Sequence, residues 1–375
     1  MPPLPRPQIP VPPALRRAVV VGAGSFGTAV AVLLARGGLR TTLQTRTAAQ
    51  AEQLNASREN AAYLPGVELP KELRIEPAAA GLGRAEFVFL AIPSAQLEAV
   101  IAGLEQAGLS RRASIVSLTK GLVPPAGTAP TVLLRERFGA ERVACVGGPA
   151  HAQEMVREGA GLVAAATDEA LASVIASVFI RAGVVCEQSD DPVGVELAGA
   201  AKNAAALAAG ATEAQGLNAA GAAAGHIFAE VWRYAERQGA RPESMIGLAG
   251  TGDLVATALA PQSRNRRAGE LLAEGVPAQQ IPERIGQAVE ALESVPLLAH
   301  ALARAGVEAP VTSALARLIG GELPLTEWVA LVRATVPPPA RWRPARAVPR
   351  GAFGRAATRI RGWLRRGEDL REAPE

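Results

Sequence analysis

Lysine is rare in this chain, and its three lysines are therefore the first candidates for chemistry. Of 39 basic residues only Lys71, Lys120 and Lys202 are lysines, and Asn203, one of five asparagines, directly follows Lys202. Lys202 lies in the alanine-rich segment AGAAKNAAALAAG, whereas Lys71, in LPKEL, is typical of a surface. Burial and a neighbouring cation lower a lysine's pKa from about 10.4. An apolar helix around Lys202 therefore favours a proton donor; a solvated helix face is the alternative.

A glycine-rich turn follows the first apolar run. The segment RRAVVVGAGSFGTAVAVLLARGG predicts a buried strand at residues 18–21, a GxGxxG turn and an apolar helix that ends near residues 37–38. Gly22, Gly24 and Gly27 then allow a tight turn, close approach of a pyrophosphate and close packing of the helix, whose N-terminus offers unpaired N–H groups. A GxGxxG between a strand and a helix predicts a dinucleotide-binding site.

The residues after the second predicted strand bear on the choice of dinucleotide. An NAD-selective site has Asp or Glu about 20 residues beyond the turn, where it binds the ribose hydroxyls. This chain has Gln44, Thr45 and Arg46 there and no acid. Because an arginine suits a 2′-phosphate, Arg46 favours NADPH over NADH, and a solvated arginine after a strand is the alternative.

A second polar constellation lies in GLAGTGDLVATALAPQSRNRRAG. Asp253 and Thr257 are four residues apart and share one face of a helix. Ser263 is a candidate N-cap, which would place Arg264 and Asn265 in the first turn of the next helix, where N–H groups and a guanidinium suit a phosphate. An ordinary capped helix with solvated arginines is the alternative. Together with Lys120, which ends another predicted strand, this turn predicts a dehydrogenase for a small phosphorylated substrate.

The elements that must position these residues form two patterns. Strands and helices alternate up to about residue 189, with further strands predicted at 41–46, 86–93, 113–121, 142–149, 160–167 and 183–187 and a helix from 94 to about 108. This pattern predicts an α/β fold with an N-terminal Rossmann-like, doubly wound, mostly parallel sheet, followed by an all-helical C-terminal domain. The predicted divisions are a proline-rich arm (1–16), a dinucleotide-binding domain (17–189), a helical substrate and catalytic domain (190–335) and a basic linker and tail (336–375).

The composition excludes several classes of protein. Hydrophobic residues make up 49% and charged residues 20%, as in a globular chain. The two cysteines, Cys145 and Cys186, lie singly in apolar runs and the three histidines are scattered, which predicts buried thiols in a reducing compartment and no structural metal. The N-terminus lacks the apolar core of an export signal, and no run of about 20 apolar residues occurs. We therefore expect a cytoplasmic protein.

The net charge of +4 is unevenly distributed. Residues 341–375 contain ten arginines and four acids, a surplus of +6, so residues 1–340 carry −2. The slightly negative charge of residues 1–340 therefore gives no indication of a nucleic-acid-binding surface. In the tail, apolar residues recur at helical spacing among arginines in AFGRAATRIRGWLRRG, a basic amphipathic pattern. One hypothesis is peripheral contact of residues 352–366 with an anionic membrane; docking on the body or an acidic partner, or a solvated tail, is the favoured alternative.

Eight blocks in a fixed order carry a family resemblance. They are VVGAGSFGTAVA, ENAAYLPGVELP, SLTKGL, GGPAHAQE, GVELAGAAKNAAALAAG, GLAGTGDLVAT, SRNRRAG and IGQAVEA. Over residues 17–332 the set resembles the NAD(P)-dependent glycerol-3-phosphate dehydrogenases of the bacterial type. The resemblance implies NADPH- or NADH-dependent, reversible reduction of dihydroxyacetone phosphate to sn-glycerol 3-phosphate, which feeds phospholipid synthesis. A homodimer is a further expectation.

The resemblance also implies roles for individual residues. Lys202 would be the general acid/base. Lys120 would orient substrate and cofactor and stabilise negative charge. Asp253 would be the third catalytic residue and would contact the substrate. The implied substrate contacts are Lys120, Gly148, Asp253, Thr257, Ser263, Arg264 and Asn265. The implied cofactor contacts are Gly22, Gly24, Ser25, Phe26, Gly27, Arg46, Tyr63, Lys120, Ala152, Arg264 and Glu290.

Five positions depart from the family pattern. The usual GPSFA is GPAHA, with Ala150 and His151; two basic positions after Lys202 are Ala220 and His226; and VEG is VEA, with Ala291. Losing one hydroxyl contact at residue 150 costs about 0.5–1.5 kcal/mol. The departures remove no proposed catalytic group, but they keep two alternatives open: a reductase of a related small hydroxyacid or ketoacid, and a catalytically inactive NAD(P)H-binding sensor.

Overall fold

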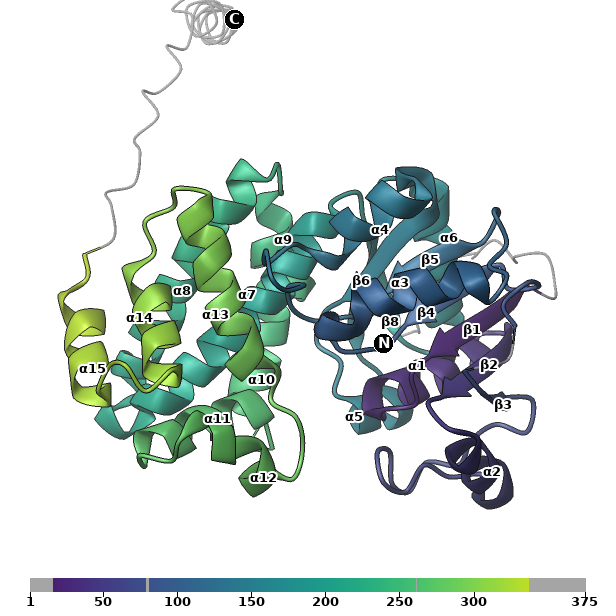
Figure 1. Ribbon diagram of the computed structural model, residues 1–375, viewed down its shortest axis with the longest axis horizontal. Helices are drawn as coiled ribbons and strands as arrows, with labels where there is room; N and C mark the ends of the chain where they lie inside the picture. The colour runs from purple at the N-terminus through teal and green to yellow at the C-terminus, as the bar shows by residue number, and fades with distance from the viewer. Residues whose placement is uncertain (1–15, 79–80, 261, 337–375) are drawn as a thin grey trace, which may run out of the picture. The chain divides into compact units, whose positions relative to one another are not determined.

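An eight-stranded sheet forms the N-terminal part of the protein (Figure 1). The structure is a computed structural model that describes residues 16–78, 81–260 and 262–336. The strands are β1 (Arg17–Val21), β2 (Arg40–Thr45), β3 (Arg74–Pro77), β4 (Phe87–Leu90), β5 (Ser114–Ser117), β6 (Val143–Gly147), β7 (Gly161–Ala166) and β8 (Val185–Ser189). They lie in the order β3-β2-β1-β4-β5-β6-β7-β8, and only the β6–β7 pair is antiparallel. The predicted mostly parallel sheet is confirmed.

The strand order reverses between β1 and β4. The chain runs outward from β1 through β2 to β3 and then returns to pair β4 with the other side of β1, in a register that sets Leu90 beside Val21. Ligands of such sheets bind at the carboxyl ends of the strands at this reversal. The glycine-rich turn that starts at Gly22 directly follows β1 and therefore lies where the sheet topology predicts a ligand.

Helices alternate with the strands up to β8, and the described residues after β8 form helices without further strands. They are α1 (Ser25–Arg36), α2 (Ala48–Ser57), α3 (Leu97–Gln106), α4 (Pro130–Phe138), α5 (Ala152–Arg157), α6 (Glu169–Arg181), α7 (Pro192–Thr212), α8 (Leu217–Arg237), α9 (Pro242–Ile246), α10 (Asp253–Leu259), α11 (Arg264–Ala273), α12 (Ile281–Ile285), α13 (Glu290–Arg304), α14 (Pro310–Ile319) and α15 (Leu325–Ala334). Figure 1 shows α8, α13, α14 and α15 grouped in the part coloured teal to yellow. The predicted helical C-terminal half is confirmed.

Alternate residues of the central strands face two separate cores. In β1, Val20 packs with α1 and α6 side chains, whereas Val19 packs with side chains of α3 and α4. In β4, Phe87 and Phe89 join the first core, whereas Val88 and Leu90 join the second. Strand side chains alternate between the faces of a sheet, so helices on both faces require this uninterrupted run of apolar residues.

Sequence patterns missed β3 and overextended several other strands. β3 has the sequence RIEP, only one of its four residues (Ile75) is fully buried, and it pairs with β2 alone at the end of the sheet. Four residues that include a proline carry no periodic signal, and pairing with β2 supplies their order. The stretches predicted as strands at 86–93 and 113–121 are strands only over Phe87–Leu90 and Ser114–Ser117. The residues beyond them form the loops of the site.

Helix α7 is buried on nearly all sides because its side chains are small. Of its 21 residues 18 are buried, and most are alanine or glycine. A Cβ on Gly210 would lie 2.1 Å from the carbonyl oxygen of Arg266, and one on Gly269 would lie 2.0 Å from that of Leu207. The backbones of α7 and α11 are therefore in contact, which brings the first turn of α11 against the middle of α7.

Two buried glutamates fix the starts of two other helices. Glu196 of α7 accepts hydrogen bonds from the backbone N (2.9 Å) and Oγ1 (2.6 Å) of Thr131 at the start of α4. Glu230 of α8 accepts the equivalent bonds from Thr312 at the start of α14, at 2.8 and 2.6 Å. A carboxylate at a helix N-terminus accepts hydrogen bonds from backbone N–H groups that have no partner within the helix. It also interacts favourably with the positive end of the helix dipole. Burial nevertheless raises the pKa of Glu196 to about 7, against the lowering effect of its hydrogen bonds with Thr131 and Ser117.

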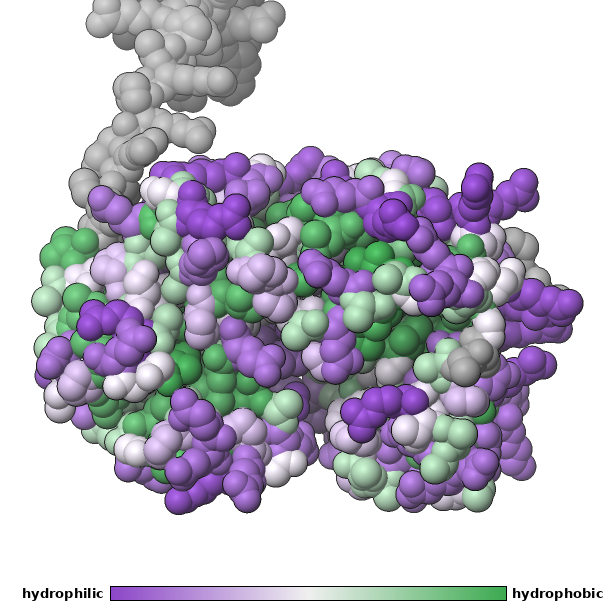
Figure 2. Space-filling model, viewed as in Figure 1, coloured by the Kyte–Doolittle hydropathy of each residue, from purple (hydrophilic) through white to green (hydrophobic). Residues whose placement is uncertain are grey.

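Some predictions fall outside what the structure describes. The basic linker and the amphipathic segment 352–366 lie outside the described residues, as does the proline-rich arm apart from Arg16. The described residues up to Thr335 form one compact unit, and the domain boundary near residue 190 stays a prediction. On the face shown in Figure 2, hydrophilic and hydrophobic residues are interspersed. Among the described residues, no helix combines the length and apolarity needed to cross a membrane.

The close contact of α7 and α11 gives the first prediction. Gly269→Ala pushes a methyl group onto the backbone of α7, and we expect it to lower the free energy of unfolding by about 1–3 kcal/mol. Gly225→Ala is the matched control, because a Cβ there has no heavy atom within 4 Å on the exposed side of α8. That change should be neutral or stabilising by up to about 1 kcal/mol. Equal effects of the two substitutions in denaturant titrations would refute the packing argument.

The buried carboxyl of Glu196 gives a pH-dependent prediction. Its pKa rises from 4.5 in an exposed carboxyl to about 7 in the folded protein. Between these values the native state holds the proton that the unfolded chain releases, so this group's contribution to stability is full below pH 4.5 and is lost as pH rises towards about 7. As pH rises from 4.5 to about 7, the unfolding free energy of the native protein should therefore fall relative to that of the Glu196→Gln variant. A constant difference from pH 4.5 to 8 would contradict the buried, protonatable carboxyl.

Candidate active site

One buried carboxylate joins the two lysines that the sequence singles out. Asp253 begins α10, and its Oδ2 lies 3.2 Å from Nζ of Lys120 while its Oδ1 lies 3.3 Å from Nζ of Lys202. Lys120 follows β5 in the loop that begins at Leu118, and Lys202 lies in the middle of α7. The side chain of Asp253 is 3% exposed and that of Lys202 8%. Three charged groups from three distant segments thus form one site.

Burial and the neighbouring charges shift the pKa values within this triad. Burial, and next the charge of Lys120, lower the pKa of Lys202 below its ordinary value of 10.5, although the acids Asp253 and Glu290 oppose this. Burial alone would raise the pKa of Asp253, but the charges and hydrogen bonds of the two lysines outweigh it and lower the pKa. Asp253 is therefore ionised at neutral pH, and Lys202 releases its proton more readily than an exposed lysine.

Three further residues complete the walls around the lysines. Lys202 donates from Nζ to Oγ1 of Thr257 (3.3 Å), and Lys120 donates from Nζ to the carbonyl oxygen of Gly148 (3.4 Å). Nζ of Lys120 also lies 5.4 Å from the centre of the Phe26 ring, in a cation–π contact. Gly148 has φ +104°, and a Cβ there would lie 2.4 Å from the carbonyl oxygen of Gly161, so only glycine fits this loop.

The glycine-rich turn has the space that a dinucleotide requires. A Cβ on Gly27 would lie 2.0 Å from the carbonyl oxygen of Gly22, and Gly22 itself has φ +109° with Ala91 packed against it. A Cβ on Gly24, by contrast, would have no heavy atom within 4 Å, and no side chain caps the N-terminus of α1. The first and third glycines thus serve the turn and the packing, while the second leaves open the approach to the N–H groups of α1. These residues fit a pyrophosphate.

The segment with the sequence ENAAYLPG closes one side of this turn. Asn60 donates from Nδ2 to the carbonyl oxygen of Ala23 (3.0 Å) and to Oγ1 of Thr28 (2.8 Å), so it fixes the turn directly. Tyr63, a predicted cofactor contact, follows on the same segment and is 49% exposed. Asn60 was not among the predicted site residues, and its signal in the sequence is that asparagine is rare in this chain.

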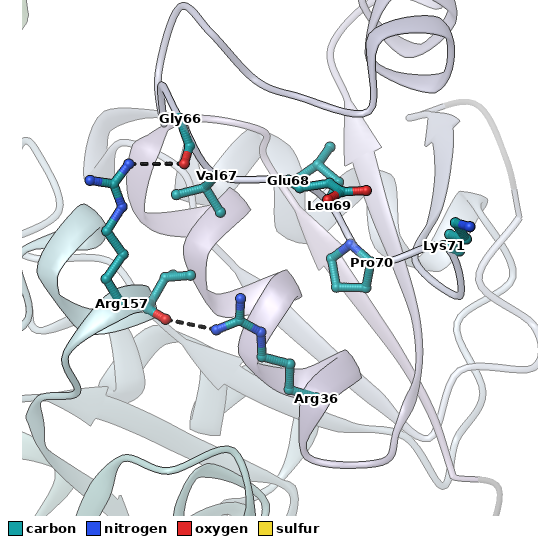
Figure 3. Close-up of a pocket in the computed structure, with 9 residues that line it drawn as sticks. Arg36, Gly66, Val67, Glu68, Leu69, Pro70, Lys71 and Arg157 are labelled. Carbon is teal, nitrogen blue, oxygen red and sulfur yellow. Dashed lines mark hydrogen bonds between the residues drawn. The ribbon is translucent and has the colours of Figure 1, made fainter.

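One arginine ties the continuation of this segment to α5, and a second ties α1 to α5 (Figure 3). Arg157 of α5 donates to the carbonyl oxygen of Gly66 (2.9 Å), and Arg36 of α1 donates to that of Val156 (2.7 Å). They line a hollow of about 470 Å³ that contains none of the predicted site residues. Lys71 lies on the opposite side of Figure 3 from Arg157 and is exposed, in agreement with its predicted surface position. Ala152, another predicted cofactor contact, starts α5.

Arg46 lies where a ribose-binding residue of the cofactor is expected. It directly follows β2, next to β1 and its glycine-rich turn, and its side chain is exposed. The structure gives Arg46 no ion pair among the described residues, so its guanidinium is available at the carboxyl end of the sheet.

The predicted phosphate turn forms as expected and connects to α7. Ser263 caps α11 by accepting a hydrogen bond from the backbone N of Arg266, which places Arg264 and Asn265 in the first turn. Arg264 is exposed, and Nη1 donates to the carbonyl oxygen of Ala288 (3.2 Å). Asn265 is buried and donates from Nδ2 to Oδ1 of Asn203 (2.8 Å).

Asn203 is a site residue that sequence reasoning left without a role. It is fully buried, and its Nδ2 donates to Oε2 of Glu290 (3.0 Å), a predicted cofactor contact. The signal was its position beside Lys202 in a chain poor in asparagine. Ser294, one turn beyond Glu290 on α13, was also missed: its Oγ is buried without a hydrogen-bond partner among the described residues, and Cβ lies beside Gly121 of the Lys120 loop.

The five departures lie at the edge of the lysine–aspartate triad or away from it. Ala291 is fully buried, but it contributes its backbone N, which donates to Oδ1 of Asn265 (3.2 Å). His151 is half-buried and its Nδ1 lies 3.5 Å from Oε2 of Glu154. Ala150 packs on the sheet core, Ala220 is buried in α8, and His226 is half-buried in the same helix.

The cysteines are buried thiols, as predicted. Cys145 lies in β6 and Cys186 in β8, and neither forms a disulfide. Burial, and then the charges of Glu196 and Asp191, raise the pKa of Cys145 well above 9.0, and burial raises that of Cys186 to about 12. These thiols therefore stay protonated and unreactive at neutral pH. Within the described residues, no three His, Cys, Asp or Glu side chains are grouped so that they could hold a metal ion.

Comparisons with known proteins agree with this arrangement. Residues 17–172 match the family described as NAD-dependent glycerol-3-phosphate dehydrogenase N-terminus, and residues 191–330 match its C-terminus. The glycerol-3-phosphate dehydrogenases [NAD(P)+] of Methylococcus capsulatus and Methylibium petroleiphilum are 37% and 38% identical over 316 and 318 residues, which cover 83% and 82% of this chain and 94% and 93% of those proteins. The crystal structure of glycerol-3-phosphate dehydrogenase from Coxiella burnetii is similar with a TM-score of 0.80 at 28% identity, over 85% of this chain and 99% of that one. The chain belongs to the NAD-dependent glycerol-3-phosphate dehydrogenase family.

Proposed function

We propose that this protein catalyses the NAD(P)H-dependent, reversible reduction of dihydroxyacetone phosphate to sn-glycerol 3-phosphate. The observation that carries the proposal is the buried carboxylate of Asp253 between the ammonium groups of Lys120 and Lys202. Carbonyl reduction needs a proton donor and a positive field where oxygen becomes negative, and this triad supplies both. It connects the loop after β5 with the helical half that carries the phosphate turn.

The sheet residues hold the cofactor in this proposal. NAD(P)H supplies the hydride. The open side of Gly24 and the N-terminus of α1, with Ser25 and Phe26, bind the pyrophosphate, and Arg46 binds a 2′-phosphate where one is present. Lys120 contacts the Phe26 ring at 5.4 Å and Asp253 at 3.2 Å, so the same lysine orients cofactor and substrate.

The proton comes from Lys202 in this mechanism. An ammonium group has three N–H donors, and Asp253 and Thr257 accept from two of them. The remaining N–H would donate to the carbonyl oxygen of the substrate and would supply the proton that this oxygen gains on reduction. Lys120 stabilises the developing alkoxide. In the reverse direction, neutral Lys202 takes the hydroxyl proton, which its lowered pKa makes possible.

The first turn of α11 binds the substrate phosphate. Ser263, Arg264 and the N–H groups of this turn supply a positive helix end and a guanidinium. A hydroxyacid or ketoacid reductase shares the need for a catalytic lysine, but the arginine-bearing helix N-terminus supports a phosphorylated substrate over a carboxylate alone.

Three finer expectations belong to this proposal. The reaction takes place in the cytoplasm and supplies glycerophospholipid synthesis. The enzyme works as a homodimer, as the family resemblance implies. Peripheral contact of segment 352–366 with anionic membranes is a hypothesis that rests on its basic amphipathic sequence, and docking on the body or an acidic partner, or a solvated tail, stays the favoured alternative.

Turnover and its pH dependence test the role of Lys202. NADPH oxidation at 340 nm with dihydroxyacetone phosphate should fall by about 10²- to 10⁴-fold in Lys202→Ala, whereas Lys71→Ala, at an exposed site, should leave it unchanged. Reduction needs the ammonium form, so kcat/KM should decline with rising pH through an apparent pKa below 10.5. Native protein that binds NADPH but oxidises none would move the function to another carbonyl substrate or to a sensor.

Cofactor selectivity tests Arg46. We expect Arg46→Ser to raise the KM for NADPH by about tenfold, because a charge-assisted bond to the 2′-phosphate is lost. The KM for NADH, which has no 2′-phosphate, should stay within about twofold. Equal changes in the KM values for NADPH and NADH in parallel steady-state assays would show that Arg46 does not bind the 2′-phosphate.

A further inference from the structure

A chain of side-chain amides crosses the site between α7, α11 and α13. Asn203, next to Lys202, donates from Nδ2 to Oε2 of Glu290 at 3.0 Å. Its Oδ1 accepts from Nδ2 of Asn265 at 2.8 Å, and Oδ1 of Asn265 accepts from the backbone N of Ala291 at 3.2 Å. Asn203 is 0% and Asn265 8% exposed. The amides form a closed circuit that begins and ends on the first two residues of α13.

The chemistry at the two ends fixes the direction of the circuit. The side chain of Glu290 offers carboxyl oxygens as hydrogen-bond acceptors, and the backbone N–H of Ala291 only donates. Asn203 must therefore turn its NH₂ towards Glu290 and its oxygen towards Asn265, and Asn265 must turn its oxygen towards Ala291. Amide orientations are ordinarily ambiguous, but here both ends require the same assignment.

A second contact ties the same two segments together. Arg264, the neighbour of Asn265 on α11, donates from Nη1 to the carbonyl oxygen of Ala288 (3.2 Å), which precedes α13. The first turn of α11 thus holds residues 288–291 through a side chain on each of two consecutive residues. Asn265 uses its carbonyl oxygen and one N–H in this circuit, and it faces the protein interior, whereas Arg264 is exposed.

We propose that Asn265 is a positioning residue for the cofactor side of the site: it fixes Asn203 and the start of α13, and through them Glu290. The proposal rests on the proposed function for the identity of the cofactor. A residue that only contacted the substrate phosphate would affect substrate binding alone. Asn265 instead sets the affinity for NADPH before any substrate is present, and it couples the phosphate turn of α11 to the dinucleotide site.

Binding of NADPH to the full-length protein without substrate tests this. Asn265→Asp keeps an acceptor for the N–H of Ala291 but sets a carboxylate against Oδ1 of Asn203, so we expect the Kd for NADPH, measured by its fluorescence, to rise about tenfold or more. Asn218→Asp, the same change at an exposed position on α8, is the matched control and should leave the Kd unchanged. An unchanged NADPH Kd in Asn265→Asp, with only a raised KM for dihydroxyacetone phosphate, would overturn the proposal.

A donor–acceptor exchange supplies an independent second test. Asn203→Asp alone sets two carboxylates face to face and should weaken NADPH binding. Adding Glu290→Gln restores a donor opposite the new carboxylate, while Asn265 still donates to its other oxygen. The double variant should therefore bind NADPH more tightly than Asn203→Asp, and a double variant that binds no better would overturn the circuit. Because no turnover is measured, a native protein that binds NADPH but does not reduce dihydroxyacetone phosphate would refute the proposed function and leave this test intact.

Discussion

The site depends on the dense burial of α7. A helix of alanines and glycines can be surrounded closely, and at Gly210 and Gly269 the backbones of α7 and α11 touch with no room for a side chain. The small residues carry little information about chemistry, but they bring the neighbouring segments within hydrogen-bond distance of Lys202 and Asn203. Larger side chains along α7 would move the first turn of α11 away from Lys202. Close packing is therefore the condition for the site's geometry.

Such burial requires that every polar group on α7 have a partner. An unpaired buried charge costs several kcal/mol, of the order of a protein's whole stability margin. Lys202 is paired with Asp253 and Thr257, Asn203 with Glu290 and Asn265, and Glu196 is hydrogen-bonded to Thr131. Asp253 pairs with both lysines, and its single negative charge offsets part of the repulsion between the two ammonium groups. Burial within the helical half lowers the pKa of Lys202, and the pairing with Asp253 limits that lowering.

Local patterns predicted the residues of the site better than they predicted its connections. The GxGxxG turn, the Ser263 cap and the shared face of Asp253 and Thr257 depend on spacings of a few residues, and the structure has all three. Lys120 and Asp253, by contrast, are 133 residues apart, and Asn203 and Glu290 are 87 apart. No periodicity encodes contacts at that separation, because the packing of whole helices creates them. β3 was missed for a related reason, since its pairing with β2 orders a segment that has no pattern of its own.

The position of each departure decides how much it matters for catalysis. Ala291 replaces a glycine of the family pattern, yet the group that it contributes to the amide circuit is its backbone N–H, which both residues possess. His151 interacts with Glu154 on α5, a helix that also carries the arginine bound to the loop of Tyr63. The lysine–aspartate triad contacts neither residue through a side chain in the structure described. In the proposed mechanism, proton transfer depends on Lys202, Lys120 and Asp253, which this chain retains. We therefore expect the departures to affect substrate affinity rather than the reaction type.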